Sequence, residues 1–196
     1  MNFQNLIYTL LSEKPSFYIS KNEEQLFKLI PELKVCKGFN QNNDWHIYDV
    51  YNHTLSVIDN VSPNIYLRLA ALFHDIGKPL SYTEDENGVG HFYGHWIKSK
   101  EIFDKYADKY NLDDYTKSIV SNLILYHDIR IPKLSENEID ELLNIFEPNE
   151  IEMLFELKRA DLLSQNSKYH YLLDDYIVQR DNLLMQYSLK EKKKHE

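Results

Sequence analysis

Histidines and aspartates that could bind a metal ion are concentrated in one part of the sequence. Six of the eight histidines lie between His46 and His127, and two of them are followed directly by aspartate, in His74-Asp75 and His127-Asp128. His74-Asp75 ends the most apolar stretch of the chain, where a buried carboxylate is unfavourable unless something compensates its charge. Imidazole nitrogen and carboxylate oxygen together suit Mn²⁺, Fe, Co²⁺, Ni²⁺ or Zn²⁺, and suit Mg²⁺ less well. These residues predict a divalent metal centre.

The candidate metal ligands fall at or near the ends of separate predicted helices. Helix ends can converge on one point of a bundle, so residues that are far apart in the sequence can form one site. Any one histidine taken alone could be a surface residue or a hydrogen-bonded core residue, and the whole set could be structural, with no exchangeable metal. The candidate ligands are His53, His74, Asp75, His95, His127 and Asp161.

The spacing of apolar residues predicts an all-α fold. Only five glycines occur, and Leu, Ile, Lys and Glu recur at helical spacing. Amphipathic spacing predicts a helix over 45–60, and the nearly continuous apolar run over 65–73 predicts a central, buried helix. Further helices are expected over 95–110, 113–126, 136–146, 149–164 and 169–188.

Residues 45–189 are expected to form one helical domain. Residues 1–44 are expected to be one or two lead-in helices packed on that domain. The glycine-containing stretch 80–94 predicts a surface loop or a short hairpin. The charged tail, 190–196, is expected to fray.

Composition limits the classes of partner. A chain of 196 residues with 43% hydrophobic residues can bury one core, and its net charge of −9 disfavours extended binding to duplex nucleic acid without forbidding a small positive pocket. The single cysteine, Cys36, excludes an intramolecular disulfide framework and a thiolate cluster from this chain. No apolar run approaches the roughly 20 residues of a membrane span. We therefore expect a cytoplasmic protein with no membrane partner, and the composition leaves the oligomeric state open.

The order of several motifs resembles a known family. His53, Leu72-Phe-His-Asp-Ile-Gly-Lys-Pro79 and the distant Asp161 resemble the HD-domain superfamily of metal-dependent phosphohydrolases. Over roughly residues 29–165 the chain is similar to the HD region of bacterial tRNA nucleotidyltransferases, the CCA-adding enzymes. That similarity rests on Pro31-Glu-Leu, His46-Ile-Tyr-Asp-Val-Tyr-Asn-His-Thr-Leu55, His91-Phe-Tyr-Gly-His95 and Arg159-Ala-Asp161. The resemblance implies a helical HD-domain bundle.

One part of the CCA-adding enzymes has no counterpart in these residues. Those enzymes carry an N-terminal nucleotidyltransferase head with a Gly-Ser motif and paired metal-binding aspartates. The 44 residues before Trp45 hold no such arrangement. We therefore expect no nucleotide addition.

The resemblance implies a site for one or two divalent ions. His53, His74, Asp75 and Asp161 would hold the first ion, and an open ligand position there would admit water and substrate. His95 and His127 would hold a second ion, with Asp75 bridging the two. The identity of the metal stays open among Mn, Ni, Co, Fe, Zn and Mg.

Lys78 and Asp128 are expected to act beside the metal ligands. Lys78 lies three residues after Asp75 at a predicted helix end, where it could neutralise a phosphate oxygen, or it could be a solvated lysine. Asp128 could orient His127 or accept a proton, because metal-bound histidines usually donate their second N–H to a carboxylate or a carbonyl. The expected catalytic residues are Asp75, Lys78 and Asp128.

Other charged residues could orient the ligands or bind the substrate. Asp49 lies one helical turn before His53 and could orient it. Arg130, Lys133 and Arg159 lie near the His127 and Asp161 helix ends, and arginine can form two parallel hydrogen bonds to phosphate. Each could equally be a surface charge. The expected substrate-binding residues are Lys78, Arg130 and Arg159.

These residues favour a metal-dependent phosphohydrolase. It would use metal-activated water as a phosphodiesterase, a phosphatase or both, on a nucleotide, a cyclic nucleotide or a nucleic-acid 3′ end. The alternative is a non-catalytic module that binds a nucleotide or an RNA end through the same metal. The partner is in either case a phosphorylated small molecule or a nucleic-acid end.

Overall fold

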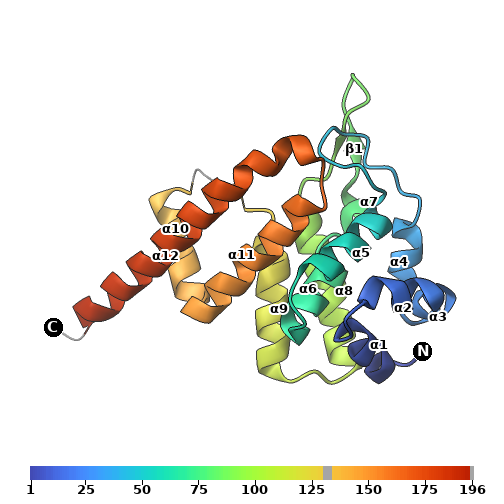
Figure 1. Cartoon of the computed structure of the whole chain (residues 1–196), viewed down its shortest axis with the longest axis horizontal. Helices are drawn as coiled ribbons and strands as arrows, with labels where there is room; N and C mark the ends of the chain where they lie inside the picture. Colours follow the sequence, from blue (N-terminus) through green and yellow to red (C-terminus); the bar gives the residue numbers. More distant parts are fainter. Residues whose placement is uncertain (130–133, 195–196) are drawn as a thin grey trace.

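The computed structural model describes residues 1–129 and 134–194, most of which are helical (Figure 1). Helices α5 to α9 form the middle of the molecule, the short helices α1 to α4 cover one side, and α10 to α12 lie on the other. The only strands in the described ranges form one small hairpin. The all-α prediction is confirmed.

Helix α6 (Ile65–Phe73) is the centre of the core. Asn64 begins it, because its side chain accepts hydrogen bonds from the first-turn N–H groups, and every residue from Leu67 to Phe73 is buried. Helix α6 packs against α1, α5, α8, α9 and α11. A helix that is apolar on every side needs such neighbours all round it.

Helix α5 (Val50–Asn60) begins later than the sequence predicts. Asp49 caps it, with Oδ1 accepting a hydrogen bond of 2.6 Å from the N–H of Asn52, so the chain before it is a loop. An aspartate in an extended conformation fits this capping role better than a place inside the helix.

A short connection joins α6 to α8 (His95–Lys109). It contains α7 (Lys78–Ser81) and the antiparallel strands β1 (Thr83–Glu84) and β2 (Gly90–His91), so the predicted short hairpin is present. Gly94, with a φ of 77°, turns the chain into α8.

The remaining helices have caps that the sequence indicates. Asp113 caps α9 (Asp114–Tyr126), Ser135 makes a capping box for α10 (Glu136–Ile145), and Pro148 opens α11 (Pro148–Leu163). A 3₁₀ helix over Ser167–Leu172 then leads into α12 (Leu173–Lys194). Helix α12 packs along α11 and α10.

Both ends of the chain differ from the prediction. The first residues form α1 (Phe3–Leu10), α2 (Pro15–Lys21), α3 (Glu23–Leu29) and α4 (Pro31–Cys36), because two prolines start new helices. At the other end, α12 continues to Lys194, where a frayed tail was expected from residue 190. The ammonium of Lys190 donates to Oδ1 of Asn144 on α10, which holds this part of the helix.

No helix in the described ranges is long and apolar enough to cross a membrane.

Candidate metal centre

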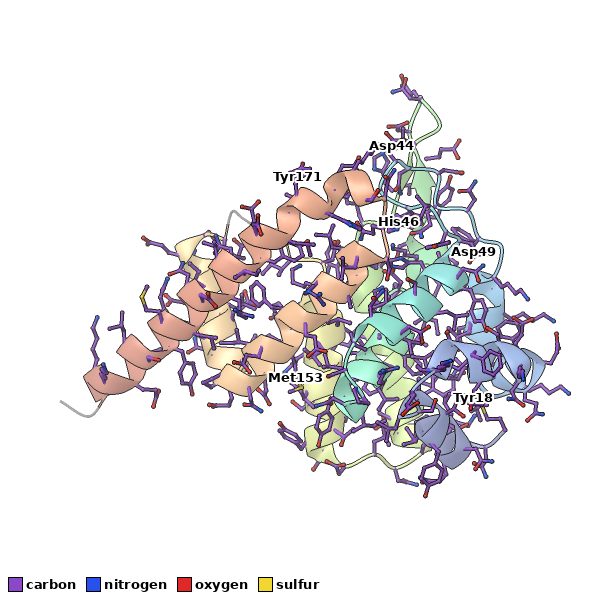
Figure 2. The ribbon with its side chains drawn as sticks, in the orientation of Figure 1. Tyr18, Asp44, His46, Asp49, Met153 and Tyr171 are labelled. Carbon is purple, nitrogen blue, oxygen red and sulfur yellow. The ribbon has the colours of Figure 1, made fainter. Side chains whose placement is uncertain are left out.

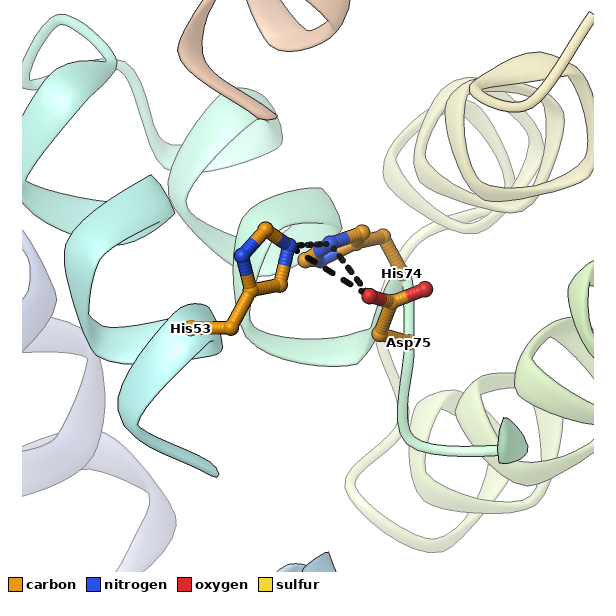
Figure 3. Close-up of side chains that lie close together, drawn as sticks. All are labelled: His53, His74 and Asp75. Atoms are coloured by element: carbon orange, nitrogen blue, oxygen red, sulfur yellow. Dashed lines mark hydrogen bonds and ion pairs between the residues drawn. The ribbon is translucent and has the colours of Figure 1, made fainter. Parts of the chain in front are cut away.

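The first group of candidate ligands joins α5 to the end of α6. His53 lies inside α5, His74 caps the C-terminus of α6, and Asp75 follows it. The three side chains converge: Nε2 of His53 lies 3.4 Å from Nε2 of His74, and Oδ2 of Asp75 lies 3.4 Å and 3.2 Å from these two nitrogens (Figure 3). All three are buried, and they could hold one metal ion.

The second group joins the start of α8 to the end of α9. His95 is the first residue of α8 and His127 caps the C-terminus of α9. Their Nε2 atoms are 3.2 Å apart, and Oδ1 of Asp75 lies 3.2 Å from that of His95 and 3.6 Å from that of His127. This buried group could also hold a metal ion.

Asp75 belongs to both groups and presents a different oxygen to each. Oδ2 faces His53 and His74, whereas Oδ1 faces His95 and His127. A carboxylate between two nitrogen pairs is the arrangement that a bridging ligand of two ions requires.

Asp161 approaches the same nitrogen of His53 that His74 and Asp75 face. Its Oδ1 is 2.9 Å from Nε2 of His53 and 4.0 Å from Nε2 of His74. Its side chain is 18% exposed, whereas those of the two histidines are fully buried. Asp161 therefore marks the side from which solvent reaches the first group.

Backbone carbonyls fix the four histidine rings. The Nδ1 atoms of His74, His95 and His127 lie 2.8, 2.8 and 2.6 Å from the carbonyls of the residues three before them. Nδ1 of His53 lies 3.4 Å from the carbonyl of Ser164. Since a carbonyl only accepts, each Nδ1 carries hydrogen, and in the neutral ring Nε2 then has a free lone pair.

The donor set fits divalent cations. Within each histidine pair two Nε2 lone pairs face each other, which is repulsive unless a proton or a metal lies between them. Oδ2 of Asp75 is buried and has no hydrogen bond of good geometry among the described residues, although the Lys78 ammonium is near. Mn²⁺, Fe, Co²⁺, Ni²⁺ and Zn²⁺ prefer carboxylates and imidazole nitrogens as ligands. A metal-bound imidazole usually donates its second N–H to a carbonyl or a carboxylate, as these rings do.

The surrounding charges keep both carboxylates ionised. Burial by itself raises the pKa of Asp75, but His74 and Lys78 outweigh it and hold that pKa well below its usual value. Burial by itself also raises the pKa of Asp161. The hydrogen bond and the charge of His53 outweigh it and hold that pKa below its usual value. Both side chains are thus anionic ligands at neutral pH.

With this geometry established, the comparisons with known proteins decide the family. The family model described as "HD domain" matches residues 43–164, more than half of the chain. The chain belongs to the HD domain family. HD domains form a superfamily of metal-dependent phosphohydrolases, and the predicted relationship is confirmed.

The HD domain is also similar to parts of curated proteins. The CC-adding tRNA nucleotidyltransferase of Thermus thermophilus is 35% identical over 107 residues, which make up 50% of this chain and 24% of that protein. The A-adding tRNA nucleotidyltransferase of Deinococcus radiodurans is 26% identical over 109 residues, 53% of this chain and 25% of that protein. The match therefore spans about a quarter of these relatives.

Lys78 of the HD domain is buried, so the solvated alternative is wrong. Its ammonium lies 2.7 Å from Oδ2 of Asp75, 2.8 Å from Oε1 of Gln41 and 3.3 Å from Nε2 of His46. Burial and the charge of Lys78 hold the pKa of His46 well below its usual value, so this ring is neutral and can accept. The ammonium therefore has two hydrogen-bond acceptors, Gln41 and His46, and one ion-pair partner, Asp75.

Two expected orienting carboxylates do not orient the HD-domain histidines. Asp128 is exposed, and a backbone carbonyl binds Nδ1 of His127 in its place. The Oδ2 of Asp49 accepts from the N–H of Gly38, while Oδ1 caps α5. Both expectations are corrected because the helix ends supply carbonyls closer to the rings. The proton-accepting role of Asp128 stays a prediction.

Of the expected phosphate-binding cations, Lys78 lies at the HD-domain site and Arg159 does not. Arg159 is exposed and lines a surface cavity of about 390 Å³ between α11 and α12, with Tyr176 and Arg180. It precedes Asp161 by two residues, or about 200° around a helix, so it points away from the metal ligands. Arg130 and Lys133 lie outside the described residues.

Sequence reasoning missed three residues beside the HD-domain ligands. Gln41 and His46, in the loop before α5, contact Lys78. Lys158 of α11 is buried and donates to the carbonyls of His127 and Ile129, at 2.6 and 2.7 Å. A lysine on the apolar face of a predicted helix is the one signal that could have found Lys158.

Proposed function

We propose that this HD domain hydrolyses phosphomonoester or phosphodiester bonds of a nucleotide, a cyclic nucleotide or a nucleic-acid 3′ end. The observation that carries the proposal is the position of Asp75, with one oxygen toward each buried histidine pair. Two groups that share a carboxylate could hold two adjacent ions, and such pairs are common in enzymes of phosphate ester hydrolysis.

This geometry supports a division of the ligands between two ions. In this proposal His53, His74, Asp75 and Asp161 hold the first ion, and His95 and His127 hold the second, with Asp75 shared. The backbone carbonyls at the four Nδ1 atoms fix the rings in the orientation that this requires.

The residues of the chain and the bound ions have separate tasks. Divalent ions in these positions would polarise the phosphoryl group and make water a better nucleophile. The buried histidines would exclude bulk solvent from the interior side of the site, and the partly exposed Asp161 would leave the other side open to substrate. Lys78 places a positive charge beside Asp75, where it offsets negative charge that develops on the ester.

The names of the curated relatives support the substrate class. Both are tRNA nucleotidyltransferases, so their HD regions belong to proteins that handle nucleotides and RNA. The matching regions cover only about a quarter of those proteins. We therefore propose the ester class from the similarity and leave the choice among nucleotide, cyclic nucleotide and RNA end to the assay.

The test is a substrate and metal panel. Purified protein, first freed of metal, is supplied with Mn²⁺, Ni²⁺, Co²⁺, Mg²⁺ or Zn²⁺ and assayed on 2′,3′-cyclic nucleotides, mononucleotides and p-nitrophenyl esters. We expect turnover that depends on metal and is absent in Asp75→Asn. Protein that contains metal and binds a nucleotide without cleaving any substrate would instead be the non-catalytic module, and protein without exchangeable metal would contradict both.

A further inference from the structure

An aromatic pair joins two segments that border the candidate metal centre. Trp45, in the loop before α5, stacks on Tyr169 of the 3₁₀ helix, with ring centroids 3.6 Å apart and an angle of 12° between the planes. Trp45 is 40% exposed although its partner covers one face of the indole. The ammonium of Lys168 lies 5.0 Å from the Tyr169 ring. The accessible aromatic surface is therefore that of Trp45.

Three polar contacts hold this pair in place. The N–H of Asn166 donates to the carbonyl of Trp45 at 2.8 Å, and its side chain donates to the carbonyl of Asp44 at 3.1 Å. Lys168 and Asp44 form an ion pair of 2.8 Å. Figure 2 shows Asp44 and His46 close to the chain that enters α12. The indole is thus fixed before any ligand arrives, and Asp44 does not face an anionic ligand with an unpaired charge.

The same two segments reach the metal ligands. His46, directly after Trp45, has its ring centroid 5.2 Å from that of His53. On the other segment, the carbonyl of Ser164 lies 3.4 Å from Nδ1 of His53. Asp161, the partly exposed ligand, precedes this segment by one helical turn. Trp45 and Tyr169 therefore belong to the two segments that contact His53.

We propose that the exposed indole of Trp45, supported by Tyr169, stacks on the nucleobase of a substrate whose phosphate ester lies at the metal centre. The inference rests on the proposed function and narrows its substrate class to esters that carry a base. Every nucleobase has a flat π face, so an aromatic side chain binds it with little dependence on sequence. A pre-ordered side chain also loses little conformational entropy when the base arrives.

The experiment compares substrates with and without a base in matched variants. The substrate pairs are 2′,3′-cyclic AMP with glycerol 1,2-cyclic phosphate, and 3′-AMP with glycerol 2-phosphate, each with the metal that gives the highest rate. The variants are Trp45→Ala and Trp45→Phe. Tyr171→Ala is the control, because Tyr171 is 69% exposed and lies only two residues after Tyr169.

We expect Trp45→Ala to raise KM for the nucleotide about tenfold, which is in the range for loss of one base-stacking contact. Its kcat and its KM for the glycerol ester should stay within about twofold of the wild type, Trp45→Phe should recover most of the affinity, and Tyr171→Ala should change neither. An equal loss on both substrates, or no change on either, would overturn the base-binding role while leaving the proposed hydrolysis intact.

A binding measurement keeps the two proposals separate. The chain has two tryptophans, so Trp45 is the only fluorophore of its kind in Trp96→Phe. We expect 3′-AMP to quench this fluorescence in the presence of metal and glycerol 2-phosphate not to do so. If the wild type hydrolyses no ester, the proposed function fails, whereas absence of quenching by 3′-AMP contradicts the role of Trp45 itself.

Discussion

The ammonium of Lys78 lies 2.7 Å from Oδ2 of Asp75, the oxygen that also faces His53 and His74. Lys78 therefore neutralises this carboxylate in the absence of a metal. A metal ion at the first group would share the same oxygen with the lysine. The metal ion and the lysine ammonium consequently compete for this oxygen of Asp75. In the transition state both would stabilise the negative charge on the substrate.

Lys78→Met should separate these two effects. Metal affinity should stay the same or increase, because a competing positive charge is removed, whereas kcat should fall on the order of 10²-fold, as for loss of one transition-state donor. In chelator, the free energy of unfolding should decrease by about 3–5 kcal/mol, since one partner of a buried ion pair is lost. Lys98→Met is the control because Lys98 is exposed. Equal kcat in Lys78→Met and the wild type would contradict the catalytic part.

Asp75→Asn should abolish activity and remove metal from both groups. The amide has a similar shape, but it lacks the charge and offers only one good ligand oxygen, so it cannot serve both histidine pairs. Elemental analysis and initial rates measure the two effects, and Asp140→Asn on the exposed face of α10 is the matched control. Full metal content with wild-type rate in Asp75→Asn would place the site elsewhere.

His95→Ala and His127→Ala should lower the metal content toward one ion per chain. Of the two oxygens of Asp75, these imidazoles face Oδ1, so the first group keeps its own ligands. His53→Ala should instead remove the first ion and almost all activity. The measurement is metal per chain after dialysis against a weak chelator. Two ions retained in the double variant His95→Ala, His127→Ala would reject the dinuclear assignment.

Gly77→Ala should displace His95, a ligand of the second group, by moving the backbone of α8. A Cβ at this position would lie 2.6 Å from the N of Ser99 and 2.7 Å from the carbonyl O of His95, so α7 and α8 would have to separate. We expect a loss of stability of more than about 1 kcal/mol, together with weaker binding of the second ion. Gly38→Ala is the comparison: its φ of 75° strains any side chain, but nothing lies within 4 Å of its added Cβ, so it should lower stability without weakening metal binding. Thermal unfolding and metal titration distinguish the two.

Lys158 should give the protein a stability that rises with pH above about 8. Burial lowers the pKa of Lys158 to about 8, against about 10.4 in an unfolded chain. Between these values the unfolded state binds more protons, so the free energy of unfolding increases with pH, by about 3 kcal/mol at most. Denaturant unfolding of the chelated protein from pH 7 to 9.5 measures the slope. Lys158→Met should reduce it, and the same slope in both proteins would contradict the assignment.

The sequence alone determined the helical class, most helix positions and the set of six candidate ligands. Helix α6 was found because six of its seven consecutive buried residues are apolar, and α10 because Ser135 and Glu138 form a local capping box. Such signals involve residues within one or two turns of each other, so they can be recognised without knowing how the helices pack.

The family resemblance implied that Asp75 is shared, but only the tertiary structure decided how the side chains meet. Asp75 turns one oxygen toward α5 and the other toward α8 and α9, and this depends on helix rotations and close approaches such as that at Gly77. The same rotations bury Lys78 against Asp75 and direct Arg159 away from the site. Contacts of this kind join residues far apart in the chain, and packing of the whole core selects them. The spacing of residues within one segment therefore carries no information about them.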